Sequence, residues 1–388
     1  MDFLSSARDQ SQSIWARILS LIGRIVLAIS IPLIAFYILY LGFIFLRDSK
    51  APQIIITLVA IVWGVGGVAI LYWIFNDLVE RLPDAWKSRL LPFVFVGPAM
   101  AILAWYLAIP TARTFWISLF NRDGPPEGLN FFQLLSSDAF VGLGNYAAVF
   151  QPGGLMFEAF RNNLMWIVFG STFSVAFGLV IAVLADRSRY ENIAKSLIFL
   201  PMAISFVGAS IIWNFIYEYR PAGQPQIGLL NAVVTGLGGT PRAWPQWVDI
   251  APWNNLFLIV IVVWLQAGYS MVLFSAALKG IPDELMEAGR IDGANEFQIF
   301  FRIMIPYIRG TIIAVWTTVV IFTLKIFDVV WVMTGGQFGT HVIATQFYRQ
   351  SFTNRNSGFG SAIAIVLLIA VIPVMYYNLR QFREQEAF

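Results

Sequence analysis

Long apolar stretches dominate this chain and alternate with shorter polar segments. An α-helix of about 20 apolar residues crosses the hydrocarbon core of a bilayer, which is roughly 30 Å thick. All but the seventh of the stretches lack charged side chains, and several contain Gly or Pro, which helices in lipid tolerate. The pattern predicts an all-α membrane protein with about eight transmembrane helices, at residues 25–46, 54–75, 91–112, 164–185, 197–217, 256–278, 311–333 and 361–379.

The polar segments between these stretches differ in length, and this predicts a division of the chain. The first two stretches are joined by the short segment 47–53 and contain few polar side chains. The third is followed by a stretch rich in Gly, Pro and Asn, and the remaining helices enclose longer loops. We therefore expect an accessory two-helix hairpin within residues 1–90, followed by a six-helix core at 91–388.

The basic residues predict the orientation in the membrane. If the N-terminus is cytoplasmic, the inner loops hold fifteen Lys and Arg residues, whereas the outer loops hold eight over a greater length. Cytoplasmic loops carry the excess of positive charge in multi-pass proteins. The N-terminal segment shows no small-residue cleavage site, so the first stretch is expected to be retained. Both termini are then predicted to be cytoplasmic.

The composition of the chain excludes several classes of function. Hydrophobic residues make up 58% of the chain and charged residues 12%, which favours lipid as the surrounding solvent. The net charge of +3 is scattered, so nucleic acid is not an expected partner. The chain has no Cys and a single His, His341, which predicts no metal site. It also lacks a phosphate-binding Gly-x-x-x-x-Gly-Lys-Ser/Thr loop, so we expect no catalytic residues and no ATP hydrolysis by this chain.

The polar segment 279–310 carries the most specific pattern. Pro282 and Asp283 form a helix start, and acidic residues there suit the helix dipole. Gly293 is expected to end this helix, and a second helical stretch follows with Phe297, Phe301 and Ile305 spaced four apart. Two short amphipathic helices on the cytoplasmic side are suited to docking in a groove of a partner protein.

This segment resembles the EAA motif in permease subunits of ATP-binding-cassette (ABC) importers. Glu287-Ala288-Gly289 is followed after three residues by Gly293, and after nine more by Ile303-Met304-Ile305-Pro306. Gly289 and Ile305 depart from the Ala and Leu of the motif, and Asp292-Gly293-Ala294 is typical of the sugar-importing branch. The resemblance implies that Glu287 pairs with a basic residue of an ATPase subunit and that the coupling contact involves Glu287, Ala288, Gly289, Asp292, Gly293, Ala294, Ile303 and Pro306.

Flanking segments extend the resemblance over about residues 91–380. Gln337-Phe338 stands where most members have Gly-Pro, which is typical of the α-glucoside branch. Eight helices match the larger permease subunit of maltose-type systems, although the folded outer insertion of the enteric one is absent. The segments that carry this similarity are 140–146, Asn163, Leu200-Pro201, Phe327-Asp328 and Thr334-Gly335-Gly336.

The resemblance also implies an assembly in the bacterial inner membrane. It would comprise this chain, a second homologous permease subunit, two ABC ATPase subunits and a periplasmic or extracellular solute-binding protein. ATP and Mg²⁺ would be bound by the ATPase subunits, with no cofactor in this chain. Transport would proceed by alternating access, with the 279–310 segment as the lever.

The side chains that could line a sugar pathway lie on the sixth and seventh stretches. A pyranose binds to flat aromatic faces and to amide or hydroxyl groups, and the family places its sugar site on the fifth to seventh helices. Lys325 and Asp328 are three apart and are expected either to form an ion pair that locks helix packing or to line the pathway. The candidates are Trp264, Gln266, Tyr269, Ser270, Thr323, Lys325, Phe327 and Asp328, each of which could instead bond neighbouring helices.

Some alternatives stay open from the sequence. Trp244, Trp247 and Trp253 could dock a binding protein or anchor the chain at the membrane interface. A membrane enzyme acting on lipid-linked sugar, or a secondary transporter, would leave the EAA-like spacing unexplained. A disaccharide, glucosylglycerol and a longer α-glucan are equally compatible substrates.

Overall fold

A computed structural model of the chain describes residues 30, 33–34, 37–38, 40–48, 50–80, 84–221 and 223–386. These residues are almost entirely helical and contain no β-strand, only an isolated bridge between Phe120 and Phe140. The predicted all-α fold is therefore confirmed. Ten of the 22 residues in the predicted stretch 25–46 lie outside the described residues, and the others are helical.

The contacts divide the chain into two compact units, Met1–Pro110 and Thr111–Phe388. The first contains α2 (Gln53–Glu80), α3 (Asp84–Leu103) and the π-helical turn η1 (Ala104–Ala108), and α4 (Ile109–Ser118) carries the boundary. Helices α2 and α3 pack side by side, with the rings of Tyr72 and Phe95 edge to face at 5.4 Å. Helix α2 is apolar around its whole circumference, as suits a helix surrounded by lipid.

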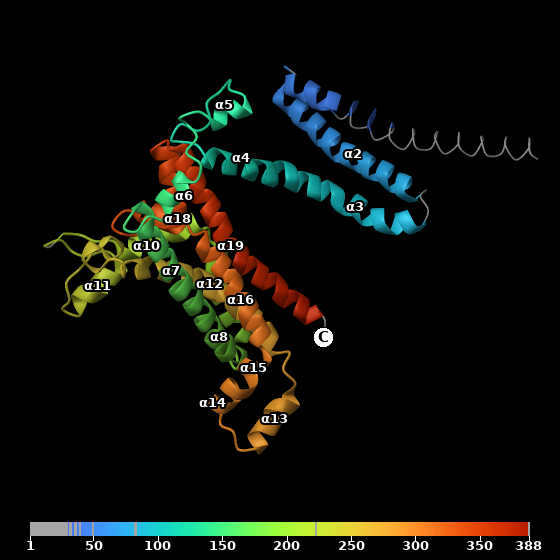
Figure 1. The fold of residues 1–388 in the computed structure, drawn as a ribbon. Coiled ribbons are helices and arrows are strands. Elements are labelled where there is room, and N and C mark those ends of the chain that lie inside the picture. Colours follow the sequence, from blue (N-terminus) through green and yellow to red (C-terminus); the bar gives the residue numbers. More distant parts are fainter. Residues whose placement is uncertain are drawn as a thin grey trace, which may run out of the picture. The chain divides into compact units, whose positions relative to one another are not determined.

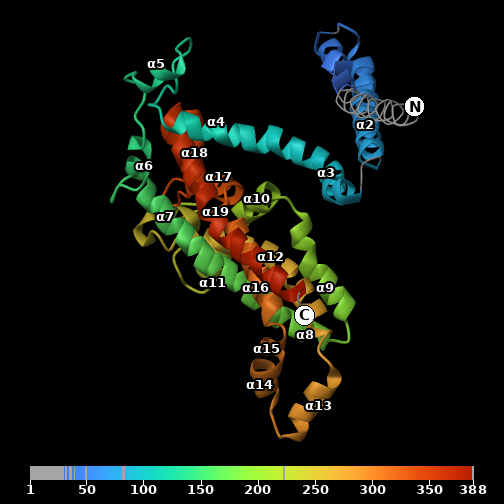
Figure 2. The ribbon, with the colours of Figure 1, turned by 45° about the vertical axis from the view of Figure 1, so that its right-hand side comes forward.

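The second unit is a bundle of long helices joined by short ones. The helices of the 279–310 segment lie at one end of this unit, and α5, α6 and α18 lie at the opposite end (Figures 1 and 2). Its elements are α5 (Phe131–Leu135), α6 (Gly144–Val149), α7 (Leu155–Met165), η2 (Trp166–Ser171), α8 (Thr172–Asp186), α9 (Glu191–Phe199), η3 (Leu200–Ala203), α10 (Phe206–Tyr217), α11 (Leu229–Gly236), η4 (Trp244–Gln246), η5 (Val248–Ile250), α12 (Asn255–Leu278), α13 (Asp283–Ile291), α14 (Glu296–Ile299), η6 (Phe300–Met304), α15 (Ile305–Tyr307), α16 (Arg309–Leu324), α17 (Asp328–Thr334), α18 (Ile343–Tyr348), η7 (Arg349–Thr353) and α19 (Ser357–Glu386).

Among the described residues, four helices are long and apolar enough to cross a membrane, or six if each bent pair is one span. The count of eight spans stays a prediction. Two predicted straight helices are interrupted. The chain bends by 102° between η3 and α10, where Ser205 caps the new helix by accepting a hydrogen bond from the Gly208 amide at 3.1 Å. Residues 311–333 do not form one helix, because α16 ends at Leu324 and α17 begins at Asp328.

Helix α12 lies at the centre of the second unit and packs most extensively against α8. A Cβ atom on Gly178 of α8 would lie 2.3 Å from Cβ of Ser270 and 3.0 Å from the Ala267 carbonyl oxygen. On another face of α12, a Cβ atom on Gly268 would lie 2.5 Å from the Ile198 carbonyl oxygen. Small residues thus allow the backbones to approach closely, which is how helices commonly associate in lipid.

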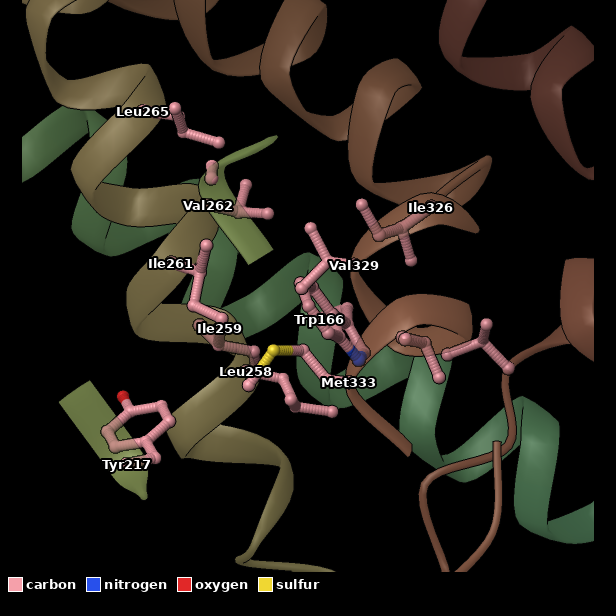
Figure 3. Packing of buried hydrophobic residues seen from close by; sticks show 13 residues of the cluster. Trp166, Tyr217, Leu258, Ile259, Ile261, Val262, Leu265, Ile326, Val329 and Met333 are labelled. Atoms are coloured by element: carbon pink, nitrogen blue, oxygen red, sulfur yellow. The ribbon is translucent and has the colours of Figure 1, made fainter. Parts of the chain in front are cut away.

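A cluster of buried apolar side chains holds the short helix α17 against α12. Trp166 of η2 is fully buried and lies among Leu258 and Ile259 of α12 and Val329 and Met333 of α17 (Figure 3). A helix of seven residues has little stability of its own, so its position depends on this packing. The core therefore fixes the segment that follows the break after Leu324.

The close α8–α12 contact predicts the effect of a larger residue. Gly178→Val should prevent the two helices from packing, since forcing side chains into a filled space typically costs about 1–3 kcal/mol. We expect less folded protein in the membrane and earlier thermal aggregation in detergent. Gly236→Val is the matched control, because no atom lies within 4 Å of the Cβ position at Gly236. Equal yields and melting temperatures for the two variants would contradict this account of the packing.

Candidate transport pathway and coupling segment

The first half of the 279–310 segment is a short helix with a defined start and end. Helix α13 begins at Asp283 after Pro282 and has two acidic residues in its first turn, as predicted. At its other end the Gly293 amide donates to the Arg290 carbonyl and the Ala294 amide donates to the Gly289 carbonyl. This is a Schellman motif, which requires a residue with positive φ after the helix. Gly293 has φ +77°, so the predicted break at this residue is confirmed.

The segment packs against the bundle with one face and leaves the other exposed. Ile281, Ile299, Met304 and Ile308 are buried in a cluster that includes Met271 and Phe274 of α12. On the other face, Glu287 is exposed together with a group of large apolar side chains: Leu285, Ile291, Phe297 and Phe301. Ile291 is 85% exposed and Phe297 is 78% exposed. An exposed patch of this kind, with an acidic residue in it, is typical of a protein interaction surface.

The second half of the segment is one continuous helical run with a wider turn in its middle. Asn295 and Gln298 form a capping box at the start of α14. The π-helical turn η6 contains Arg302. In an α-helix the Arg302 carbonyl would accept a hydrogen bond from the amide of residue 306, but Pro306 has no N–H to donate. The helix continues through Pro306, and the bend of 72° comes at Ile308, between α15 and α16.

Ion pairs join this segment to the neighbouring turn between α8 and α9. The Glu296 carboxylate contacts Arg187 at 2.5 Å and Arg290 at 3.4 Å. Lys195 pairs with both Asp186 and Glu191, and Glu191 also contacts Lys279 at 2.5 Å. Exposed pairs contribute little individually to stability, but a network restrains the geometry of the elements it joins. The sequence did not predict these ion pairs. The capping box at Asn295 and Gln298, which positions Glu296, follows a sequence pattern that could have been recognised.

Two of the predicted pathway residues line a common cavity. Gln266 and Tyr269, in the middle of α12, face a cavity of about 330 Å³. Phe206 of α10 and Phe322 of α16 also line it, and their rings are stacked at 4.8 Å between centroids. The cavity thus combines an amide, a phenol and aromatic rings, with Met202, Ile204, Leu265, Thr318 and Val319 as its other walls.

Three other predicted pathway residues take part in packing. Trp264 contacts Trp213 edge to face at 6.0 Å. Thr323 is fully buried, and its hydroxyl lies 3.1 Å from that of Ser171. Ser270 is buried against Gly178, and its hydroxyl has no hydrogen-bond partner among the described residues.

The remaining candidates surround the break between α16 and α17. Lys325 and Asp328 are both exposed, and the described residues show no ion pair between them. Of the two alternatives for these residues, the structure does not show the mutual ion pair on one helix, because the helix ends between them and their spacing is no longer that of one helical face. Phe327 stacks on Trp331 at 5.5 Å and also contacts Tyr348.

A buried asparagine satisfies the backbone at this break. The Asn163 side chain, on α7, donates to the Leu324 carbonyl at 3.1 Å and accepts from the Ile343 amide at 2.8 Å. The Leu324 carbonyl is at the end of α16 and the Ile343 amide is at the start of α18, so neither can form a hydrogen bond within its own helix. The sequence resemblance placed Asn163 where the fourth helix begins but did not predict this role.

His341 lies nearby in the loop before α18. Its Nε2 atom accepts a hydrogen bond from Arg349 at 3.0 Å, so the proton of the neutral ring is on Nδ1, which donates to the Thr345 hydroxyl at 3.2 Å. Burial, and then the positive charge of Arg349, lowers the pKa of His341 to about 4. His341 is thus a neutral structural residue at neutral pH.

A second buried asparagine organises the segment between α10 and α12. The Asn231 amide donates to the carbonyls of Glu218 and Arg242 at 2.9 and 3.0 Å. Its oxygen accepts from the Arg242 amide at 3.0 Å and from the Trp244 indole at 2.8 Å. All four hydrogen-bonding positions of the side chain are used, and the Trp244 indole N–H is engaged within the chain.

Comparison with known proteins identifies the family. Residues 174–384 match the binding-protein-dependent transport system inner membrane component family. The match includes the whole 279–310 segment and the stretches 256–278 and 311–333, which carry the candidate pathway residues. The chain belongs to this family. It is the permease subunit of an ABC importer, not an enzyme, and it works in the inner membrane with a binding protein and a separate ATPase.

Similar proteins and structures agree with this assignment. The permease is 53% identical over 293 residues to the osmoprotective compounds uptake permease protein GgtC of Synechocystis sp., covering 76% of this chain and 99% of the relative. It is 44% identical over 342 residues to the alpha-glucoside transport system permease protein AglF of Rhizobium meliloti, covering 84% and 97%. The fold matches a bacterial ABC transporter that imports alginate, with a TM-score of 0.61 at 19% identity, over 78% of this chain and 99% of that one. The predicted importer permease is confirmed, and neither rival class is supported.

Proposed function

We propose that the permease carries a glycoside, an α-glucoside or a related oligosaccharide, inward by alternating access. The observation that carries this proposal is the cavity at the middle of α12, where Gln266 and Tyr269 face the stacked rings of Phe206 and Phe322. The name of one relative, the alpha-glucoside transport system permease protein of Rhizobium meliloti, supports the same class of ligand.

The chemistry of the cavity suits a sugar. An amide both donates and accepts hydrogen bonds, and a phenol can do the same, so Gln266 and Tyr269 can bind hydroxyl groups of either polarity. The Phe206 and Phe322 rings offer apolar faces for the C–H patches of a pyranose. A volume of about 330 Å³ lies at the lower end of the range for small-molecule sites, roughly 300–1,000 Å³.

The exposed residues at the break between α16 and α17 would extend this pathway. Lys325 and Asp328 lack a mutual ion pair among the described residues, and intramembrane charges usually face a water-filled cavity. Phe327 begins an aromatic group with Trp331 and Tyr348. Trp264, Ser270 and Thr323 would act indirectly, by holding the helices that carry the lining residues.

The exposed face of the 279–310 segment would be the contact with the ATPase. Glu287 and the apolar side chains around it form a surface that fits a groove, and Gly293 allows the turn between α13 and α14. The proposed assembly contains a second permease subunit and two ATPase subunits that bind ATP and Mg²⁺. Closure of the ATPases would move this segment and, through its ion pairs, the neighbouring turn between α8 and α9.

The proposed orientation has both termini and the 279–310 segment in the cytoplasm, as the distribution of basic residues favours. The chain has no Cys, so a single introduced thiol reports its own exposure. In intact cells, Ser136→Cys should react with a membrane-impermeant thiol reagent, whereas Glu284→Cys should react only after the membrane is opened. Both positions are exposed, so burial does not explain a difference. The reverse pattern of labelling would reverse the orientation.

The substrate proposal predicts different effects for two neighbouring residues of α12. Gln266→Leu keeps a similar volume but removes the amide, and the loss of one or two hydrogen bonds, at about 1 kcal/mol each, should weaken sugar-dependent transport roughly five- to thirty-fold. Ser270→Ala removes a hydroxyl that has no hydrogen-bond partner in the described part of the chain and should leave transport unchanged. Uptake of radiolabelled maltose, sucrose, trehalose and glucosylglycerol provides the measurement. Unchanged uptake of every transported sugar by Gln266→Leu would remove the main support for this cavity as the sugar site.

The coupling proposal predicts a loss of communication without a loss of folding. Glu287→Lys reverses an exposed charge on α13, so the permease should reach the membrane at normal levels. In the variant a lysine would face the basic residue of the ATPase groove, and this repulsion would cost several kcal/mol of binding free energy. ATP hydrolysis stimulated by loaded binding protein should therefore fall more than tenfold. Gly293→Val should act similarly, because a β-branched residue is strained at φ +77°. Glu127→Lys, an exposed reversal between α4 and α5, is the control. Wild-type stimulation in Glu287→Lys would contradict the coupling role.

A further inference from the structure

A second cavity of about 180 Å³ lies at the far end of α10. Its walls are the last turn of α10, the residues that follow it, the segment containing Gln246, and Met333 of α17. Asn214 lines this cavity and follows Phe206, which lines the first cavity, by eight residues, or roughly 12 Å along a helix. The two cavities therefore adjoin the same helix at different depths.

The order of the two cavities along α12 is fixed by a hydrogen bond. The Tyr217 hydroxyl, which belongs to the second cavity, donates to the Phe257 carbonyl near the start of α12 at 2.9 Å. Gln266 of the first cavity lies nine residues further along, or roughly 14 Å closer to Lys279. The second cavity thus lies beyond the first, on the side away from the 279–310 segment.

The polar side chains of the second cavity are free to bind a ligand. Asn214, Glu218, Tyr219 and Gln246 line it, and within the described part of the chain none of these four side chains makes a hydrogen bond. Two amides, a carboxylate and a phenol together provide donors and acceptors for neighbouring hydroxyl groups. All four side chains are exposed, and a small number of polar groups around one cavity is typical of a small-molecule site.

The cavity is also held in shape by the buried side chain of Asn231. Its four hydrogen bonds tie the backbone of the lining residue Glu218 to Arg242 and Trp244, which flank the lining residue Ala243. Gly228 adds to this restraint, because a Cβ atom there would lie 2.2 Å from the Glu218 carbonyl oxygen. A cavity whose walls are already fixed loses little conformational entropy when it binds.

We propose that this second cavity is a docking subsite for one ring of the transported glycoside, which passes from it to the Gln266–Tyr269 cavity. A volume of about 180 Å³ is below the range for a whole small-molecule ligand, so it suits one end of an elongated one. The free amide, carboxylate and phenol groups recognise hydroxyls. This inference rests on the proposed function, since it takes the transported ligand to be a glycoside.

The test uses the fact that the chain has no Cys. Gln246→Cys places a single thiol in the subsite, and Gln224→Cys places one on an exposed residue of the same α10–α12 connection that lines neither cavity. The complete importer, with its partner subunits, is reconstituted in nanodiscs and trapped with ATP and vanadate. Alkylation by a maleimide is then timed with and without the glycoside that the wild-type importer takes up, with glycine betaine at equal osmolality as the reference.

The glycoside should slow alkylation at Gln246→Cys at least threefold and leave Gln224→Cys unchanged. If Gln246→Cys does not assemble, Asn214→Cys serves as the reporter. Equal rates with and without glycoside would overturn the subsite alone, provided that the wild-type importer takes up that glycoside. Protection by sugar-free binding protein, but not by glycoside, would also overturn it and would mark the cavity as part of a protein contact. No uptake of any of the four tested sugars would overturn the proposed function and the subsite with it.

Discussion

The arrangement of this permease depends on how backbone polar groups are satisfied where helices break. In lipid, an unpaired amide or carbonyl costs several kcal/mol, so a break requires a partner for each exposed group. At the break after α16, Asn163 supplies that partner by bonding both the Leu324 carbonyl and the Ile343 amide. One buried side chain on α7 thereby holds the end of α16 and the start of α18. The positions of Lys325, Phe327 and Asp328 follow from it.

The same principle operates at a second place in the unit. Asn231 bonds the backbone of Glu218, which lines the cavity at the end of α10, to the backbone of Arg242. Asn254 similarly donates to the carbonyls of Pro245 and Phe338, at 3.1 and 2.8 Å. A primary amide suits this task because it has two donors and two acceptor positions but no charge to desolvate. Irregular backbone can therefore surround the cavity at the end of α10 without exposing unpaired groups to lipid.

The sequence predicted the parts of this fold that depend on local patterns. Apolar runs indicated the long helices, and Pro282, Asp283 and Gly293 indicated the bounds of α13, because caps and positive-φ turns have short-range signals. It did not predict the break between Leu324 and Asp328, since an apolar run is the same whether its helix is continuous or interrupted. For the same reason it left an ion pair between Lys325 and Asp328 as one of two alternatives. The two cavities, and the roles of Asn163 and Asn231, arise from contacts between residues far apart in the chain, which a single sequence does not show.

The most direct test of the account is whether the exposed face of α13 touches the ATPase. Leu285 is an exposed residue of α13, so a photoreactive phenylalanine analogue can replace it without filling space in the core. Irradiation of the complete importer in nanodiscs should give one adduct between the permease and the ATPase subunit, and the adduct should be absent when the analogue replaces Phe132, an exposed residue of α5. Adducts at Leu285 with lipid or binding protein, and none with the ATPase, would contradict the central claim that the 279–310 segment receives the energy of ATP hydrolysis.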